Sequence, residues 1–189
     1  HFSIWNEINN VNVKKIKKIY LTASGGPLLK FKKSSIHKVD IKTILKFNSQ
    51  FQLLVSIVLS AQTTDENVNK ATKGLFKKYP NAKLLSAAKL RDIESLVFST
   101  GFYKVKSKNI HTLSKVLVSD YNSRIPKTID ELVKLPGVGR KTASVFLAET
   151  FDQPTIAVDT HVLRVSHRLG FSSKRYDPIQ TEKELKQLF

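Results

Sequence analysis

From residue 51 onward the apolar residues recur every three or four positions, and this spacing restricts the possible folds more than any other feature. Leu53, Leu54, Ile57 and Val58 would share one face of a helix, and the same spacing continues in later segments. No segment alternates apolar and polar residues long enough for a sheet. Turn-forming residues separate the segments at Pro80, Gly101, Pro126, Pro136, Gly137, Pro154 and Gly170. The pattern predicts an all-α fold of short helices joined by tight loops.

Two pairs of polar residues at capping-box spacing mark expected helix starts. Thr128 is followed three positions later by Glu131, and Thr181 by Glu184. In such pairs the side chains satisfy the free amides of the first helical turn. We therefore expect helices to begin near residues 129 and 182.

The stretch 128–151 has the pattern of a helix-hairpin-helix, in which two helices flank the turn Leu-Pro-Gly-Val-Gly. Gly137 and Gly139 allow a tight turn and a close approach to another surface. The second helix opens at Arg140 and presents amides and a positive dipole end where a phosphate can bind. Such a hairpin binds the DNA backbone without reading sequence, since phosphates carry no base identity. The alternative is a turn that only joins two packed helices.

The charge balance favours a polyanionic partner. The chain has 32 Lys and Arg residues against 15 Asp and Glu residues, a formal net charge of +17, which exceeds what solubility requires. The alternative is a compositional bias with a solvated basic surface. The longest apolar stretch, residues 51–61, falls short of the about 20 residues of a membrane helix. The absence of cysteine excludes disulfides and thiolate-bound metals in this chain.

Three separated motifs resemble the endonuclease III family of base-excision-repair enzymes, over roughly residues 47–189. They are Leu-Ser-Ala-Gln-Thr-Thr-Asp at 59–65, Leu-Pro-Gly-Val-Gly-Arg-Lys-Thr-Ala at 135–143 and Pro-Thr-Ile-Ala-Val-Asp-Thr-His at 154–161. The resemblance implies a helix-hairpin-helix glycosylase bundle with a core at 47–153 and the start of a second helical subdomain at 154–189, which we expect to be truncated. The implied activity is that of a bifunctional DNA glycosylase and abasic-site lyase, which removes oxidised pyrimidines and cleaves 3′ of the abasic site by β-elimination.

The same resemblance implies that Lys141 is the nucleophile and that Asp159 is the carboxylate that assists it. A lysine amine can attack the sugar C1′, displace the base and form a Schiff base. The attacking amine must be neutral, so the site has to favour that form through desolvation and the positive helix start. Family members specialised for adenine opposite damaged guanine lack this lysine, so Lys141 favours the pyrimidine-lesion branch. The alternatives are a phosphate contact for Lys141 and a helix N-cap for Asp159, a role that is compatible with assistance.

Further contacts with DNA follow from the resemblance. Gln62 and Phe102 correspond to groups that enter the DNA stack, and phenylalanine there replaces a common leucine without loss of wedge character. The alternative for Phe102 is an ordinary core or surface residue. Asp65 corresponds to a position near the lesion pocket, or else caps the following helix. The expected backbone-binding residues of the hairpin are Gly137, Val138, Gly139, Arg140 and Thr142.

Two departures from the family pattern concern the ends of the chain. The family usually holds a four-iron cluster in a cysteine loop, but this chain has no cysteine, so we expect no cofactor in it and interpret the chain as a fragment. The Lys-rich residues 1–46 include an expected short strand at 17–22, and they contain His-Phe-Ser-Ile-Trp at 1–5 and Ile-Tyr-Leu-Thr-Ala-Ser-Gly-Gly-Pro at 19–27. On these two stretches the segment resembles 1-deoxy-D-xylulose-5-phosphate reductoisomerase. Because its dinucleotide-binding domain and acidic metal ligands are missing, we expect no such activity. The junction near residues 46–50 is interpreted as a fusion or assembly artefact, with a natural linker as the alternative.

The sequence therefore predicts a monomeric, cytoplasmic and nucleoid-associated protein that acts on double-stranded DNA with damaged bases or abasic sites, without membrane association. The alternative is a non-catalytic, sequence-independent DNA-binding fragment of such an enzyme. A reductoisomerase remnant is the third hypothesis.

Overall fold

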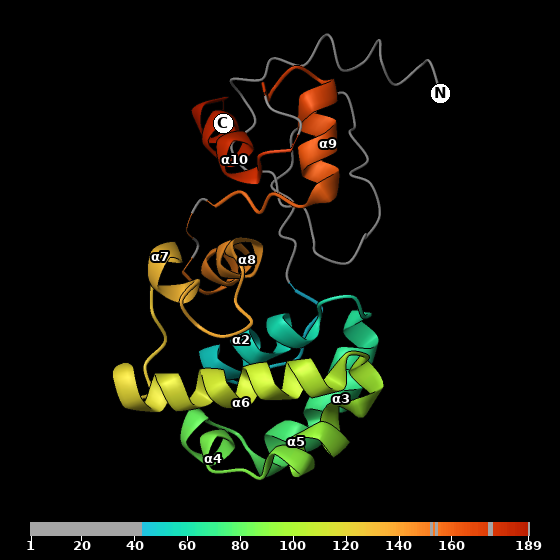
Figure 1. The fold of residues 1–189 in the computed structure, drawn as a ribbon, viewed down its shortest axis with the longest axis vertical. Coiled ribbons are helices and arrows are strands. Elements are labelled where there is room, and N and C mark those ends of the chain that lie inside the picture. Colours follow the sequence, from blue (N-terminus) through green and yellow to red (C-terminus); the bar gives the residue numbers. More distant parts are fainter. Residues whose placement is uncertain (1–42, 152, 154, 174–175, 189) are drawn as a thin grey trace. The chain divides into compact units, whose positions relative to one another are not determined.

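The computed structural model describes residues 43–151, 153, 155–173 and 176–188 (Figure 1). The reductoisomerase-like segment up to residue 42, with the strand expected at 17–22, lies outside the described residues. Every regular element of the described part is a helix, which confirms the predicted all-α fold. The described residues divide into two compact units, 43–155 and 156–188.

The first unit is a helical bundle. In chain order its described helices are α2 (Gln50–Leu59), α3 (Asp65–Lys78), α4 (Ala82–Ser86), α5 (Leu90–Val97), the 3-10 turn η2 (Phe98–Thr100), α6 (Tyr103–Asp120), α7 (Ile129–Leu132) and α8 (Arg140–Phe151). The hairpin between α7 and α8 lies where the sequence predicts it.

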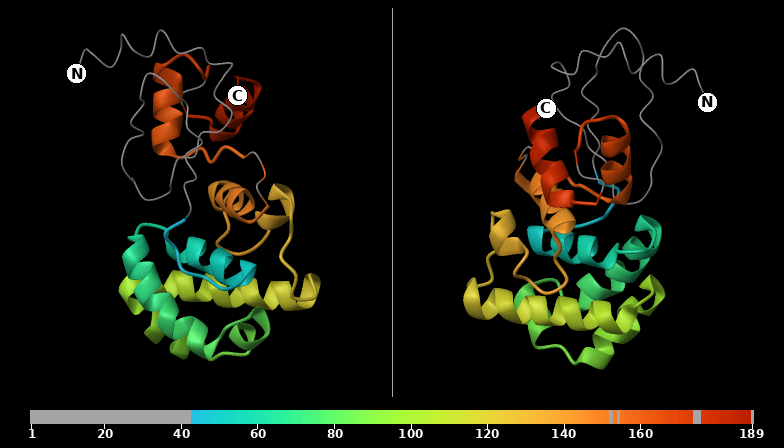
Figure 2. Two further views of the ribbon diagram at one scale, coloured as in Figure 1. Left: turned by 180° about the vertical axis from the view of Figure 1, so that it is seen from behind. Right: turned by 45° about the horizontal axis from the view of Figure 1, so that its top comes forward.

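Helix α2 forms the centre of this bundle. Every residue from Phe51 to Leu59 is buried, the polar Gln52 and Ser56 among them, as expected for a mainly apolar helix that is covered on all sides. It contacts α3, α6 and α8, and the views in Figures 1 and 2 agree that it lies between α6 and α8. Despite its composition, neither α2 nor any other described helix combines the length and apolarity that a membrane crossing requires.

Two helix starts show how local capping positions the site. Helix α3 begins after Thr64, whose Oγ1 accepts from the Asn67 amide at 3.3 Å. Asp65 is therefore the first helical residue, so the alternative that it caps the helix is wrong. Helix α7 begins at the predicted residue: Thr128 Oγ1 accepts from the Glu131 amide at 3.3 Å and donates to the Glu131 carboxylate at 2.7 Å.

The second unit contains α9 (Thr160–Arg168) and α10 (Pro178–Leu188), which contact each other. Helix α9 begins after Asp159, whose Oδ1 accepts from the amides of His161 and Val162, both at 2.9 Å. Asp159 is thus an N-cap, as one of its two compatible roles predicts.

The predicted start of α10 near residue 182 is wrong, because the helix already begins at Pro178. Asp177 supplies the first-turn acceptor, with Oδ1 2.9 Å from the Gln180 amide. Thr181 lies inside the helix, fully buried, with its hydroxyl 2.8 Å from that of Ser172. A tertiary contact has taken the side chain that the local pattern assigned to capping.

Candidate active site and DNA-binding surface

The hairpin is anchored to the core and exposes its glycines. Leu135 and Val138 are buried, while Gly137 and Gly139 are exposed. The Val138 amide donates to the Leu135 carbonyl at 3.0 Å, so this predicted DNA-contacting residue closes the turn and anchors it. The exposed backbone at Gly137 and Gly139 is the part of the hairpin that another molecule can approach closely.

Gly137 also brings the hairpin close to α6. Its φ is +78°, and a Cβ at this position would lie 2.9 Å from the Cβ of Asn109. Real Cβ atoms do not approach so closely, so only glycine fits here without a shift of α6 or of the hairpin. The contact with α6 therefore fixes the position of the exposed turn relative to that helix.

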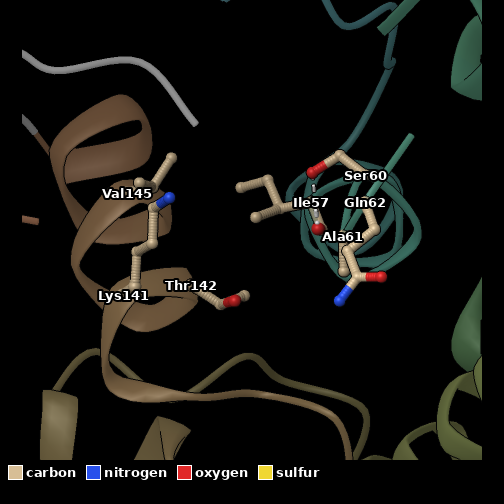
Figure 3. A pocket seen from close by; sticks show the side chains of 7 residues that line it. All are labelled: Ile57, Ser60, Ala61, Gln62, Lys141, Thr142 and Val145. Carbon is tan, nitrogen blue, oxygen red and sulfur yellow. Dashed lines mark hydrogen bonds between the residues drawn. The ribbon is translucent and has the colours of Figure 1, made fainter. Parts of the chain in front are cut away.

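The first turn of α8 carries three predicted residues, Arg140, Lys141 and Thr142, all half-buried. Lys141 and Thr142 line a pocket of about 210 Å³ together with residues from the end of α2. Figure 3 shows the two sides of this pocket facing each other. Its lining residues are Ile57, Ser60, Ala61, Gln62, Lys141, Thr142 and Val145. Two predicted site residues from motifs far apart in sequence, Gln62 and Lys141, thus share one pocket.

The pocket combines apolar walls with a few polar groups. Ile57 and Val145 supply apolar surface, and the stem of Lys141 runs beside Val145 (Figure 3), as lysine stems commonly cover apolar surface. The Ser60 hydroxyl donates to the Ile57 carbonyl at 2.8 Å, which helps to end α2. An amine, the amide of Gln62 and the hydroxyl of Thr142 therefore line the pocket together.

Gln62 and Phe102 both occupy left-handed backbone conformations, with φ of 56° and 48°. In the described residues the same region contains two other non-glycine residues, Asn122 and Ser123, in the turn after α6. Such a conformation costs roughly 1–2 kcal/mol for an L-residue. Phe102 is 69% exposed, which excludes the core alternative. Left-handed backbone at non-glycine residues is often found at functional sites.

Sequence reasoning missed two residues that hold the turn between η2 and α6. Asn67 Nδ2 donates to the Ser99 carbonyl at 2.5 Å and to Thr63 Oγ1 at 3.0 Å. Lys106 Nζ donates to the Thr100 carbonyl at 2.6 Å. Burial lowers the pKa of Lys106 below its ordinary value. No local pattern marks either residue, because Asn67 reaches a carbonyl 32 residues away in the sequence and Lys106 reaches one that lies before the start of its own helix.

The remaining predicted residues lie elsewhere. Asp159 is half-buried at the start of α9, in the second unit, whereas Lys141 belongs to the first. Asp65 lies in the first turn of α3 and does not line the Lys141 pocket. Within the described ranges no group of His, Cys, Asp and Glu side chains could hold a metal ion. The sequence also has no cysteine, so the residues present do not fit a cysteine-ligated iron cluster.

Comparison with protein families defines the class. The model of the HhH-GPD superfamily base excision DNA repair protein matches residues 55–189, most of the chain. The chain belongs to this superfamily. A second model, the 1-deoxy-D-xylulose 5-phosphate reductoisomerase C-terminal domain, matches residues 1–64 and overlaps the first at 55–64.

Individual relatives narrow the likeness to endonuclease III. The chain is 47% identical to endonuclease III of Bacillus subtilis over 141 residues, which cover 75% of this chain and 64% of that protein. It is 46% identical to endonuclease III of Synechocystis over 145 residues, covering 76% of this chain and 66% of the relative. The chain thus spans about two thirds of the length of these relatives. The predicted family resemblance is confirmed.

Solved structures agree with the family. A trapped covalent intermediate of endonuclease III with DNA matches with a TM-score of 0.73 and 45% identity, covering 79% of this chain and 70% of that one. A non-covalent endonuclease III–DNA complex matches with a TM-score of 0.70 and 46% identity, covering 77% and 68%. A thermostable thymine-DNA glycosylase shares the fold, with a TM-score of 0.59 and 24% identity.

Proposed function

We propose that this protein is a bifunctional DNA glycosylase and abasic-site lyase that removes oxidised pyrimidines from double-stranded DNA. The position of Lys141 carries the proposal: it lies in the first turn of the helix that follows the hairpin, and it lines one pocket with Gln62. A phosphate bound at the hairpin would bring the adjoining sugar to this helix start. The likeness to a trapped covalent endonuclease III–DNA intermediate supports a covalent route.

In the proposed reaction the Lys141 nitrogen attacks C1′ of the damaged nucleotide. The bond between C1′ and the base breaks, and the base leaves with the electron pair and takes up a proton. Loss of a proton from nitrogen and opening of the sugar ring give a Schiff base. Removal of a C2′ proton then expels the 3′ phosphate as the C3′–O bond breaks, and water releases the lysine.

Asp159 is proposed as the carboxylate that stabilises positive charge at C1′ and supports the proton transfers. Its Oδ1 caps α9 through two amides, and this cap fixes the carboxylate on a rigid element, as a positioned catalytic group requires. These steps use only amine and carboxylate groups, so they need no cofactor held by this chain.

The hairpin and the exposed turns supply the proposed contacts with DNA. Gly137, Gly139, Arg140 and Thr142 would hold the phosphate backbone, with a net charge of +17 favouring association. Gln62 and Phe102 would fill the space that the extruded nucleotide leaves. The protein would act as a monomer on the nucleoid in the cytoplasm.

The test is borohydride trapping on duplex DNA with one abasic site, because borohydride reduces a Schiff base to a stable adduct. The wild type should form a covalent adduct and cleave the strand, and Lys141→Ala should do neither while it still binds DNA. Lys134→Ala, which removes an exposed lysine that directly precedes the Leu-Pro-Gly-Val-Gly turn, is the matched control and should retain the adduct.

The outcomes separate the two hypotheses. An adduct that persists in Lys141→Ala would exclude this lysine as the nucleophile. Salt-sensitive, sequence-independent binding by a folded wild type that forms no adduct would instead establish the non-catalytic DNA-binding fragment.

A further inference from the structure

Two exposed, strained turns lie at the ends of two helices and are joined through one side chain. The first carries Gln62 after α2, and the second carries Phe102 before α6. Asn67, in the first turn of α3, donates from Nδ2 to Thr63 Oγ1 beside the first turn and to the Ser99 carbonyl beside the second. A single amide group therefore links two turns that are far apart in the sequence.

Lys106, near the start of α6, also holds the second turn. Its ammonium donates to the Thr100 carbonyl at 2.6 Å, and the residue is only 5% exposed. Its backbone amide also donates to the Phe102 carbonyl at 3.1 Å. Burial of an ammonium group is unfavourable unless the group is hydrogen-bonded, and here the acceptor belongs to the turn itself. Side chains from α3 and α6 thus hold two consecutive carbonyls.

We propose that Asn67 and Lys106 are positioning residues that together clamp the turn carrying Phe102 at a fixed place relative to the turn carrying Gln62. The inference rests on the proposed function and deepens it, since the clamp acts when the base is extruded and has no part in the chemistry at Lys141. A wedge separates stacked bases only if its support does not yield. Relaxation of the left-handed backbone at Phe102 would withdraw the ring, and the clamp prevents this relaxation.

The test uses variants that remove the clamp and leave the core intact. Asn67→Ala removes the amide, while the Asn67 backbone keeps its bond to Thr64 Oγ1. Lys106→Met keeps the buried stem and removes the ammonium. Lys115→Met is the matched control, because Lys115 is an exposed lysine of the same helix. Thermal unfolding followed by circular dichroism confirms that each variant is folded; if Lys106→Met does not fold, Asn67→Ala carries the test.

The readout is base unstacking in a duplex with a tetrahydrofuran abasic analogue opposite 2-aminopurine, whose fluorescence rises when it is unstacked. This analogue cannot form a Schiff base, so the measurement is independent of Lys141. The wild type and Lys115→Met should raise the fluorescence, whereas Asn67→Ala and Lys106→Met should lose most of the rise. In both clamp variants, adduct formation at a true abasic site in duplex DNA should decrease by about tenfold to 100-fold. It should not decrease in single-stranded DNA, where no stacked bases oppose insertion of the wedge.

Epistasis distinguishes positioning from a general structural role. Because the clamp acts through the wedge, neither variant should lower the fluorescence further in a Phe102→Ala background. Three results would overturn the proposal. The first is a further loss of fluorescence when either variant is combined with Phe102→Ala. The others are a loss of adduct formation on single-stranded DNA as large as that on duplex DNA, and a fluorescence rise equal to that of the wild type in both variants. If the wild type forms no adduct but raises the fluorescence in a clamp-dependent way, the proposed lyase activity fails and the clamp stands.

Discussion

Replacing Gly137 by alanine should destabilise the first unit by an amount that can be divided into two parts. The φ of +78° is a left-handed conformation, which costs an L-residue roughly 1–2 kcal/mol. The new Cβ would also lie 2.9 Å from Cβ, 3.0 Å from Nδ2 and 3.2 Å from Cγ of Asn109. Because the Asn109 Cβ is fixed to the α6 backbone, this overpacking should add about 1–3 kcal/mol.

Gly139 serves as the control in urea unfolding followed by circular dichroism. It has an ordinary φ and nothing within 4 Å of the place that a Cβ would take. Both glycines belong to the first unit, so one transition reports on them. Gly139→Ala should stay close to the wild type, and Gly137→Ala should lose about 2–5 kcal/mol. A loss for Gly137→Ala no larger than the roughly 1–2 kcal/mol of the left-handed conformation would refute the proposed contact with α6.

Two further predictions concern the second unit. Asp159→Asn should keep an acceptor for the first amides of α9 and preserve stability, whereas Asp159→Ala should lower the free energy of unfolding by about 1 kcal/mol. Both variants should slow borohydride trapping. Trapping by Asp159→Asn at the wild-type rate would exclude a role for the carboxylate. Glu184 accepts hydrogen bonds from Ser173 and Gln180 that lower its pKa from 4.5 to about 2. Since the folded-state pKa is the lower one, this stabilisation is complete above pH 4.5 and is lost as the pH falls from about 4.5 towards 2. Glu184→Gln should therefore flatten the acid unfolding curve of the second unit in that window, and an unchanged curve would contradict the assignment.

The two capping-box patterns show where local sequence reasoning succeeds. At Thr128 both partners lie on the surface, so the local pattern decides the structure and α7 begins as predicted. Thr181 has the same pattern, but its hydroxyl is buried against Ser172 and Asp177 caps the helix earlier. A capping signal is reliable only where no tertiary contact competes for the side chain.

The site shows the same division between local and tertiary information. Family motifs placed Gln62 and Lys141 in one functional group, and the structure brings both to one pocket. The support of the Phe102 turn could not be predicted, because Asn67 reaches a carbonyl 32 residues away in sequence. Lys106 is one of 32 basic residues, and no composition or spacing distinguishes the buried lysine from those in water. Only the folded backbone reveals which carbonyl its ammonium meets.

Helix α6 contacts both the Phe102 turn and the hairpin, the two elements that are proposed to bind DNA. Phe102 immediately precedes it, Lys106 holds the Phe102 turn, and Asn109 meets the hairpin at Gly137. At 1.5 Å rise per residue, Phe102 and Asn109 are separated by about 10 Å along the helix. A rigid helix would therefore set the offset between the step opened by the wedge and the phosphate bound by the hairpin. Both exposed turns are fixed against this helix, but by different means. At Gly137 the absence of a side chain allows the hairpin to contact α6, and at Lys106 a buried ammonium of α6 binds a carbonyl of the Phe102 turn.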